Sequence, residues 1–460
     1  MSSVNMNNLI KTLVRIHSYS QPIDYVKPFV NQERNESVGS GTFVDPTVLG
    51  LPTQPEILYI LTCAHVIDKA DQVSVVLPLK GSEKIPATVL AFVPKLNYDL
   101  AIIALPNPGG EYNAFISTLP LGDSTQLQPG EKLVALGFPM GQTGLKVSDG
   151  VFAGIEHYLQ HTVSISPGNS GGPLINTAGE LIGINNAGIT HAAASNIGYA
   201  VPIELYSITA ARFFSKTVGP PSGERVLRQP LFGFLLQPTT QAHLAMVAGQ
   251  DAVGRSGVFM YYIVPGSPAE EAGLQEGDFL GEIEQIPCDF HGEIKVSWSA
   301  QKVPIETVLQ RLSDPSRAYS FTVYMAKSKE WRMVQLGPKV LHLYASLHRY
   351  SPYEPVEYMD IQGFIIMQLV HNHKQYEDTF KSCIELSLPQ RFQPHVIITY
   401  VVPGSAADVS KTLKAGDLLT AVNGVQVRYL KDVQRSLSHE KNGTLSPTWL
   451  TTSKGKSTVI

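Results

Sequence analysis

The chain has 460 residues, of which 43% are hydrophobic and 16% are charged, a composition that fits globular domains and excludes extensive disorder. The net charge of −4 gives no broadly basic surface, so we expect no nucleic-acid partner. Three cysteines, Cys63, Cys288 and Cys383, are too few for a disulfide framework and are typical of a reducing compartment.

The first twenty residues lack the pattern of a signal peptide, because Lys11 and Arg15 interrupt their apolar residues. Nowhere does an uncharged apolar stretch reach the roughly 18 residues that a membrane-spanning helix needs. We therefore expect a soluble, intracellular and cytoplasmic protein without membrane insertion. A transit peptide for an organelle stays open as an alternative.

Many short apolar runs separated by Gly, Pro and Asn fill residues 9 to about 208, among them LIKTLVRI, ILYILTCAHVI and LAIIAL. Short β-branched strands at such close spacing predict an all-β barrel or sandwich. A final helix is expected over residues 202–216. The Pro- and Gly-rich stretch 218–230 is expected to be a linker.

The C-terminal half contains an internal repeat. YYIVPGSPAEEAGLQEGDFLGEIEQI (261–286) aligns with TYVVPGSAADVSKTLKAGDLLTAVNGV (399–425), with V-P-G-S-x-A and L-x-x-G-D-x-L in common. Agreement at so many positions indicates two copies of one module. Each copy is followed by a predicted helix, 306–314 in the first and 430–439 in the second.

Ser170 lies in SISPGNSGG (164–172), a serine among three glycines. A serine nucleophile needs a base, a group that orients the base, and donors for the developing oxyanion. His65 in LTCAHVID and Asp99 in NYDLAIIAL are the candidates for base and acid, and the amides of Gly168 and Ser170 are candidate donors. Taken singly, these residues also fit a glycine-rich turn, a core histidine and a turn-capping aspartate.

GNSGGP, LTCAHV and YDLAIIAL resemble the trypsin-like serine proteases, and NIGYAVP and GSGTFV resemble the HtrA (Deg) family among them. The repeated module resembles the PDZ domain. The resemblance implies a mainly β protein, with a chymotrypsin-like double β-barrel followed by two PDZ-like α+β domains. The expected boundaries are 1–217 for the protease domain, 218–230 for the linker, 231–340 for the first PDZ domain and 341–460 for the second.

The resemblance implies that Ser170 is the nucleophile, that His65 is general base and then general acid, and that Asp99 orients His65. Gly168, Asn169 and Ser170 would form the oxyanion hole, without a metal or organic cofactor. Asn169 stands where digestive relatives carry an aspartate, so activation by N-terminal clipping is not expected. Ordering of the loops 137–148, 163–169 and 185–196 would set the activity instead.

The specificity pocket is expected to be formed by four residues, Ile165, Asn185, Ala187 and Ile197. No acidic residue occupies positions 164–166, which disfavours a Lys/Arg preference and predicts cleavage after small or medium aliphatic residues. Cys63 is expected to be a packed strand residue.

In the first PDZ-like module the turn and strand expected to hold a peptide carboxylate and backbone are Leu231, Phe232, Gly233, Phe234 and Leu235. A core strand with a glycine bulge is the alternative. The corresponding stretch of the second module is 361–369, which either forms a working groove or serves only for packing. His371 and His373 follow in an insert and are expected in a solvated loop rather than at a metal.

We therefore expect an ATP-independent serine endopeptidase that cleaves unfolded or damaged proteins and recruits them by their C-terminal peptides. A scaffold or holdase chaperone with a latent protease fold is one alternative, and a processing protease for one dedicated substrate is another. Tyr19, Tyr25 and Phe29 resemble the N-terminal aromatic residues that build HtrA trimers, so a homo-oligomer, a trimer or its multiple, is predicted.

Overall fold

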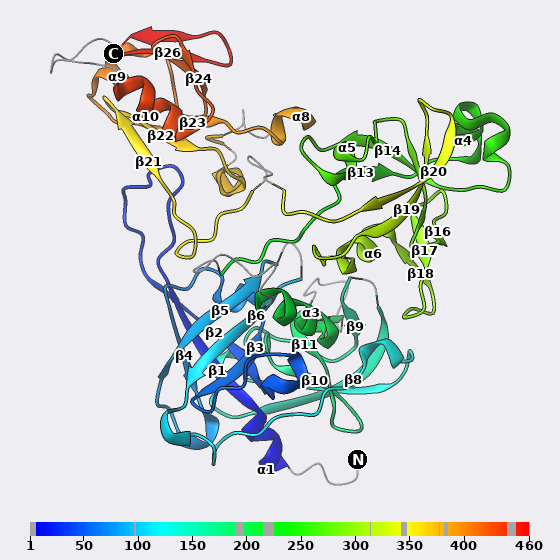
Figure 1. Ribbon diagram of the computed structural model, residues 1–460. Coiled ribbons are helices and arrows are strands. Elements are labelled where there is room, and N and C mark those ends of the chain that lie inside the picture. Colours follow the sequence, from blue (N-terminus) through cyan, green and yellow to red (C-terminus); the bar gives the residue numbers. More distant parts are fainter. Residues whose placement is uncertain are drawn as a thin grey trace. The chain divides into compact units, whose positions relative to one another are not determined.

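The computed structural model describes residues 6–95, 98–155, 157–188, 197–214, 225–312, 314–341, 347–376, 378–380, 385–438 and 448–459 (Figure 1). The chain divides into two compact units. The first consists of Met1–Ser20 and Asn35–Leu341, and the second of Gln21–Arg34 and His342–Ile460.

The first barrel closes in the strand order β1-β2-β3-β6-β5-β4. Its strands are β1 (Leu13–Ser20), β2 (Asn35–Val44), β3 (Ile57–Thr62), β4 (Gln72–Val76), β5 (Ile85–Val93) and β6 (Leu100–Pro106). Strand β6 is buried from Leu100 to Leu105, as its unbroken apolar sequence LAIIAL requires. The short helix α2 (Ala64–Ile67) begins directly after β3.

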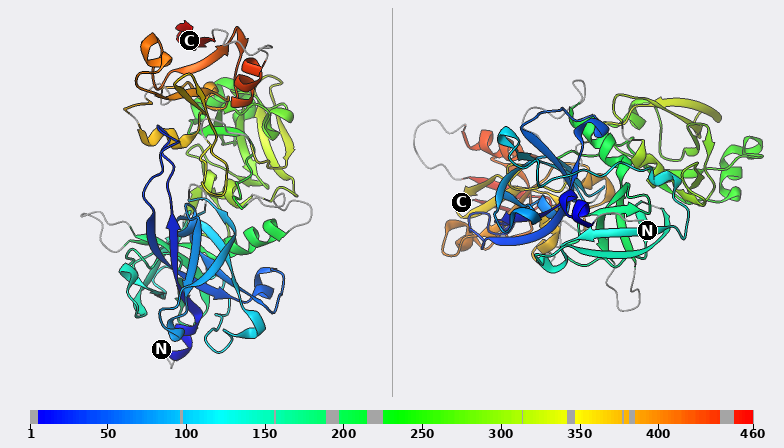
Figure 2. Two further views of the ribbon diagram at one scale, coloured as in Figure 1. Left: turned by 90° about the vertical axis from the view of Figure 1, so that its left-hand side faces the viewer. Right: turned by 90° about the horizontal axis from the view of Figure 1, so that it is seen from below.

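The second barrel closes in the order β10-β11-β12-β9-β8-β7. Its strands are β7 (Lys132–Gly137), β8 (Lys146–Ile155), β9 (Leu159–His161), β10 (Pro173–Asn176), β11 (Leu181–Gly188) and β12 (Gly198–Pro202). Helix α3 (Ile203–Phe214) follows β12, within the range predicted for a helix. Figure 2 shows the strands of the two barrels in blue, cyan and green from two further directions. The predicted double β-barrel is thus confirmed.

Residues 225–341 form the first C-terminal module. Its main sheet has the order β13-β14-β15-β19-β20. The strands are β13 (Phe234–Gln237), β14 (Val258–Ile263), β15 (Phe279–Ile283), β16 (Ile286–Pro287), β17 (Glu293–Lys295), β18 (Lys302–Pro304), β19 (Tyr319–Met325) and β20 (Glu330–Leu336). The helices are α4 (Gln241–Ala248), α5 (Pro268–Glu271) and α6 (Ile305–Arg311).

The end of the predicted linker is packed rather than free. Phe92 of β5 donates its backbone N–H to Arg225 O at 2.9 Å, and Leu227 donates to Phe92 O at 2.8 Å. Gln229 Nε2 donates to Gln310 O at the end of α6, at 3.1 Å. Residues 225–229 therefore add to the first barrel and continue to the first C-terminal module; residues 218–224 lie outside the described residues.

Residues 347–459 form the second C-terminal module, with the sheet order β21-β22-β23-β24-β26-β27. Its strands are β21 (Tyr358–Ile361), β22 (Phe364–Gln368), β23 (Val396–Val401), β24 (Leu418–Val422), β25 (Val425–Gln426), β26 (Trp449–Thr452) and β27 (Ser457–Val459). Its helices are α8 (Leu388–Arg391), α9 (Ala406–Ser410) and α10 (Leu430–Ser438). Cys383 lies outside the described residues.

Residues 21–34 connect β1 to β2 but pack in the second unit. Tyr25 is buried there, and its ring lies 5.2 Å from that of His373 in an edge-on contact. The ring of Phe29 lies 6.0 Å from that of Tyr400. The predicted domain 1–217 included this segment, whereas the structure assigns it to the second unit. Because Tyr25 is buried within its own chain, it is not free for the predicted trimer contact.

His373 is not part of a solvated loop, which corrects the prediction for the insert after β22. It lies in a short 3-10 helix, His371–Tyr376, and is fully buried. Its Nδ1 lies 3.2 Å from the backbone N of Val370. Burial lowers the pKa of His373 to about 4, so the ring is neutral at pH 7.

Candidate active site

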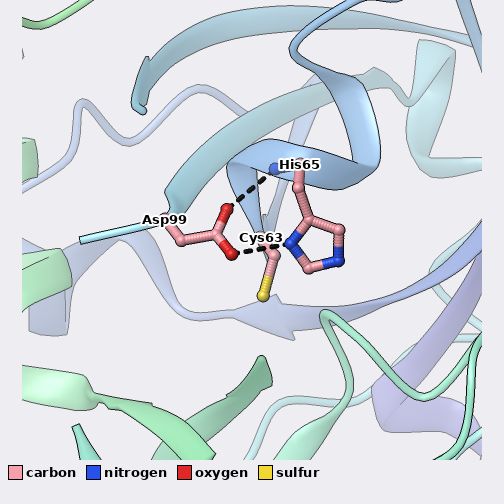
Figure 3. A group of neighbouring side chains, drawn as sticks. All are labelled: Cys63, His65 and Asp99. Atoms are coloured by element: carbon pink, nitrogen blue, oxygen red, sulfur yellow. Dashed lines mark hydrogen bonds and ion pairs between the residues drawn. The ribbon is translucent and has the colours of Figure 1, made fainter. Parts of the chain in front are cut away.

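Two hydrogen bonds join His65 and Asp99 (Figure 3). Asp99 Oδ2 lies 2.6 Å from His65 Nδ1, and Asp99 Oδ1 accepts a hydrogen bond from the His65 backbone N–H at 2.8 Å. The Asp99 carboxylate is fully buried. Because an ionised carboxylate only accepts hydrogen bonds, the pair places the ring proton on Nδ1 and the lone pair on Nε2. The ring is thus arranged as a proton acceptor.

The local fold brings this pair together. Thr62, the last residue of β3, pairs with Ala101 near the start of β6. The turn into α2, which carries His65, and the residue before β6, Asp99, therefore lie at the same end of two paired strands. Asp99 has a left-handed φ of 58°, a conformation that aspartate adopts more readily than most residues.

Cys63 lies beside this pair. It is buried as expected, but it follows β3 as the N-cap of α2 and is not a strand residue. Burial raises the pKa of its thiol well above the ordinary value, and Sγ donates to Asn185 O at 3.2 Å. Among the described residues, Cys63, His65 and Asp99 are the group whose potential metal-ligand atoms lie within 4.8 Å of one another. With the thiol protonated and Nδ1 bonded to Asp99, these groups fit an acid–base pair better than a metal site.

Ser170 lies in the turn between β9 and β10. Its Oγ donates to the backbone carbonyl of Asn186 in β11 at 2.5 Å. Within the described residues the backbone amides of Gly168 and Ser170 have no hydrogen-bond acceptor, so both are free to bind an oxyanion. The amide of Asn169 donates to Ser166 O at 3.0 Å. Asn169 is therefore not an oxyanion donor here, which corrects its assignment.

Ser40 of β2 shapes the Ser170 turn, and the sequence-based prediction missed it. Ser40 Oγ donates to Gly168 O at 2.7 Å, and the Ser40 backbone N–H donates to Ser170 O at 2.8 Å. Gly171 has a φ of 89°, and a Cβ there would lie 1.9 Å from Ser40 O, so only glycine fits. The segment GSGTFV, which carries Ser40, was the available signal.

The four predicted pocket residues have different surroundings. Ile165 is half-buried and packs against the core of the second barrel. Asn185 is fully buried, and its Nδ2 donates to Gly172 O and Pro173 O at 3.1 and 3.0 Å. Asn185 therefore braces the strands and is not a pocket wall, which corrects that prediction. Ile197 is half-buried before β12, and the side chain of Ala187 lies outside the description.

The predicted peptide-binding stretch of the first C-terminal module surrounds a left-handed glycine, Gly233, with a φ of 93°. Leu231 forms an isolated bridge with Lys339, and Phe232 is buried in the module core. Phe234 and Leu235 begin β13, which lies at an edge of the sheet in the described part of the chain. The stretch thus places a glycine turn beside an available strand edge.

Comparison with known proteins supports these features at the level of sequence families. Residues 39–184 match the trypsin-like peptidase domain, and residues 397–445 match the PDZ domain. The chain is 26% identical over 395 residues to a "Probable periplasmic serine endoprotease DegP-like" of Chlamydia pneumoniae, covering 84% of this chain and 70% of that protein. It is 28% identical over 248 residues to the "Periplasmic pH-dependent serine endoprotease DegQ" of Escherichia coli, covering 52% and 50%.

Solved structures share the fold. An HtrA-type protease, AlgWS227A, with a decapeptide matches with a TM-score of 0.53 at 18% identity, covering 76% of this chain and 98% of that chain. The same protease with a tripeptide matches with a TM-score of 0.51 at 20% identity, covering 73% and 96%. At these identities the likeness establishes the fold alone.

The predicted cytoplasmic location is wrong. The relatives from C. pneumoniae and E. coli are both named as periplasmic endoproteases, which points to an extracytoplasmic location. Among the described helices, none has the length and apolar character needed to cross a bilayer.

The two family matches agree with the positions of the site residues and of the second C-terminal module. The peptidase match spans His65, Asp99 and Ser170, and the PDZ match lies in the second C-terminal module. The chain spans 70% of the C. pneumoniae relative and about half of the E. coli one. In these two matches and in its fold, the chain is similar to HtrA-type serine proteases that carry a C-terminal PDZ domain.

Proposed function

We propose that the chain hydrolyses peptide bonds with Ser170 as nucleophile, His65 as general base and then general acid, and Asp99 as the group that orients His65. The observation that carries this proposal is the pair of hydrogen bonds between Asp99 and His65, at 2.6 and 2.8 Å, which leaves Nε2 free to accept a proton. Ser170 Oγ attacks the carbonyl carbon while its proton passes to Nε2, and Nε2 then protonates the leaving amine. The amides of Gly168 and Ser170 stabilise the oxyanion.

Water completes the reaction by the reverse sequence. Nε2 removes a proton from the water, the hydroxide attacks the acyl carbon, and the proton is returned to Ser170 Oγ as the acid product leaves. The whole cycle uses groups of this chain and needs no ATP. No G-x-x-x-x-G-K-[ST] segment occurs in the sequence, which agrees with ATP independence.

One observation favours a second function, that of a peptide-binding scaffold or holdase with a latent protease fold. The Ser170 hydroxyl is directed to the carbonyl of Asn186, and no hydrogen bond joins Ser170 to His65 within the described residues. The described arrangement therefore requires a rotation of the Ser170 side chain before proton transfer. If the rotamer with the Asn186 bond persisted, the chain would bind peptides without cleaving them.

For the substrate, we propose unfolded or damaged proteins, cleaved after small or medium aliphatic residues. The apolar side chain of Ile165 and the lack of an acidic residue at 164–166 support this preference. The relatives named above are endoproteases, and the solved structures named above hold peptides. A processing protease with one dedicated substrate is distinguished by its cleavage profile, which would be narrow on a peptide library from a whole proteome.

Both C-terminal modules are, in this proposal, PDZ domains. The family match covers only the second, but the five-strand order of the first, β13-β14-β15-β19-β20, corresponds to β22-β23-β24-β26-β27 in the second. Leu231 to Leu235 of the first module would bind the C-terminal peptide of a substrate by strand addition. A homo-oligomer remains a prediction, which sedimentation of the purified chain would test.

The decisive experiment is casein hydrolysis by the wild-type chain, Ser170→Ala and Ser166→Ala, each with and without a peptide that ends in an aliphatic residue. Ser170→Ala is expected to lower turnover on the order of 10⁶-fold, whereas Ser166→Ala removes a hydroxyl from the same loop and keeps activity. A fluorophosphonate probe should label the wild type and not Ser170→Ala. No labelling and no cleavage in any condition would refute the enzyme and support the scaffold.

A further inference from the structure

The two C-terminal modules have one equivalent strand, β13 in the first and β22 in the second. Each follows a left-handed glycine, Gly233 with a φ of 93° and Gly363 with a φ of 101°. A Cβ on Gly233 would lie 2.2 Å from Ser267 Oγ, and a Cβ on Gly363 would lie 2.1 Å from Ser405 Oγ. Both strands also shift register after their second residue. The two turns are therefore the same structural position in two copies.

The two copies differ at the outer edge of this strand. Strand β13 ends its sheet in the described residues, whereas β22 carries a further antiparallel strand, β21, along its outer edge (Figure 1). The pairing runs from Tyr358 opposite Met367 to Ile361 opposite Phe364. A peptide that binds by strand addition would need this same edge. In the second module the edge is already paired by the chain itself.

The side chains of β21 fill the apolar space beside the edge. Ile361 is buried, and Met359, two residues earlier on the same face of the strand, is half-buried. Both belong to the apolar cluster that contains Leu430 and Val433 of α10. These are alternating apolar residues between a strand and a helix, the arrangement that a bound peptide would adopt.

A carboxylate also occupies the glycine turn. Asp360 Oδ1 accepts a hydrogen bond from the Gly363 backbone N–H at 2.7 Å. In the first module, no side chain among the described residues is bonded to the equivalent amide of Gly233. A free peptide carboxylate that entered the second module would therefore compete with Asp360 for its donor, and with Ile361 for its pocket.

We propose that β21, Tyr-Met-Asp-Ile at 358–361, is a built-in ligand of the second module. It closes that groove to C-terminal peptides, so that the chain takes up such peptides in the first module alone. The proposal depends on the strand-addition role proposed for these modules and not on the peptidase. Phe29 of the β1–β2 connection lies 6.4 Å, ring to ring, from Tyr358, so release of β21 would also disturb that connection.

The test uses the full chain with Ser170→Ala, which prevents cleavage, and a fluorescein-labelled Tyr-Met-Asp-Ile peptide with a free carboxylate. Anisotropy and calorimetric titration are expected to show one peptide per chain. Leu309→Lys places a charge on α6, where Leu309 packs against the core of the first module, and should weaken binding at least about tenfold. Two peptides per chain would overturn the proposal. So would a Leu309→Lys chain that binds the peptide as tightly as the unaltered one, because the second module would then be the site of binding.

Opening the second groove supplies the converse test. In the Leu309→Lys chain, Asp360→Ala with Ile361→Ser removes the carboxylate at the glycine turn and the buried side chain of β21, and should restore binding of one peptide. Glu357→Ala, directly before β21, is the matched control and should restore none. A folded double variant that still fails to bind would overturn the proposal.

Hydrogen exchange on the otherwise unaltered Ser170→Ala chain gives a readout that needs no variant in the grooves. At saturating peptide, amides of β13 should gain protection, while those of β21 and β22 should exchange as before. Faster exchange in 358–361 with new protection in 364–368 would mean that peptide displaces β21, which contradicts the proposal. No protection in β13 would contradict peptide uptake by the first module and would overturn that part of the proposal.

Discussion

Asp99 holds His65 by two atoms: one carboxylate oxygen accepts from the His65 backbone N–H, and the other lies 2.6 Å from Nδ1. The hydrogen bond to the backbone N–H holds the main chain of His65 in place, and the hydrogen bond to Nδ1 determines which ring nitrogen carries the proton. A buried carboxylate whose two oxygens are both hydrogen-bonded to His65 holds the imidazole in one position and orientation. The geometry therefore separates two roles of Asp99, which are position and charge.

Asp99→Asn should lower kcat for casein by about 10⁴-fold while the chain stays folded. The amide keeps the shape of the carboxylate, but its NH₂ group can donate to Nδ1 and so move the ring proton to Nε2, where the base is needed. Asp251→Asn, at an exposed aspartate of the first C-terminal module, is the control and should leave kcat unchanged. Turnover by Asp99→Asn within tenfold of wild type would contradict the assigned tautomer.

Substitutions at Asn185 and Ile165 should separate a bracing residue from a pocket residue. Asn185→Ala leaves the Gly172 and Pro173 carbonyls without their side-chain donor, so we expect a loss of about 1–3 kcal/mol in unfolding free energy and an unchanged cleavage preference. Ile165→Ala should instead shift the preference toward larger apolar residues. Denaturant titration and cleavage of a peptide library measure the two effects. A changed preference in Asn185→Ala would restore it to the pocket.

The short apolar runs predicted an all-β barrel or sandwich, and the resemblance carried by the motifs around His65, Asp99 and Ser170 implied two barrels, which the structure confirms. The sequence could not predict that the backbone N–H of Asn169 donates to Ser166 O, since the direction of a backbone N–H depends on the dihedral angles of the turn. Nor could the letters reveal that Asn185 turns inward toward Gly172. These errors all concern orientation within a correctly located segment.

Long-range pairing was the other limit. The sequence predicts a trimer contact for Tyr25, whereas its ring packs against that of His373, more than 300 residues later in the chain. Strand β21 has only four residues, too short for its alternation to distinguish a strand from a loop. The question whether the second module has a working groove therefore needed the sheet order.

Asp68 is the buried C-cap residue of α2, the helix that carries His65, and should make stability depend on pH. Burial raises its pKa from the ordinary value to about 6, with the charge of Asp99 adding to the effect. A raised carboxyl pKa stabilises the fold fully at pH below 3.8, and that contribution is lost as pH rises through about 6. Asp68→Asn should thus be the more stable protein at pH 7.5 and gain nothing at pH 4. Thermal unfolding at the two pH values measures this, and an equal difference at both would contradict it.

His373 should make the second unit sensitive to acid. Burial lowers its pKa to about 4, so its contribution is present above the unfolded value of 6.5 and is lost as pH falls toward 4. At pH 5 the expected loss is about 2 kcal/mol in the free energy of opening, on the order set by that shift. Its ring contacts those of Tyr25 and Phe380, each at 5.2 Å, so the loss should reach residues 21–34.

Hydrogen exchange of residues 21–34 at pH 5 and pH 7, corrected for the intrinsic rates, measures this opening free energy. His373→Phe keeps an aromatic ring between Tyr25 and Phe380 but cannot titrate, so its opening free energy should be the same at both pH values. His291→Gln, at an exposed histidine of the first C-terminal module, should retain the wild-type difference. If His373→Phe kept that difference as well, another group would be the source of the acid sensitivity, because a phenylalanine ring cannot be protonated.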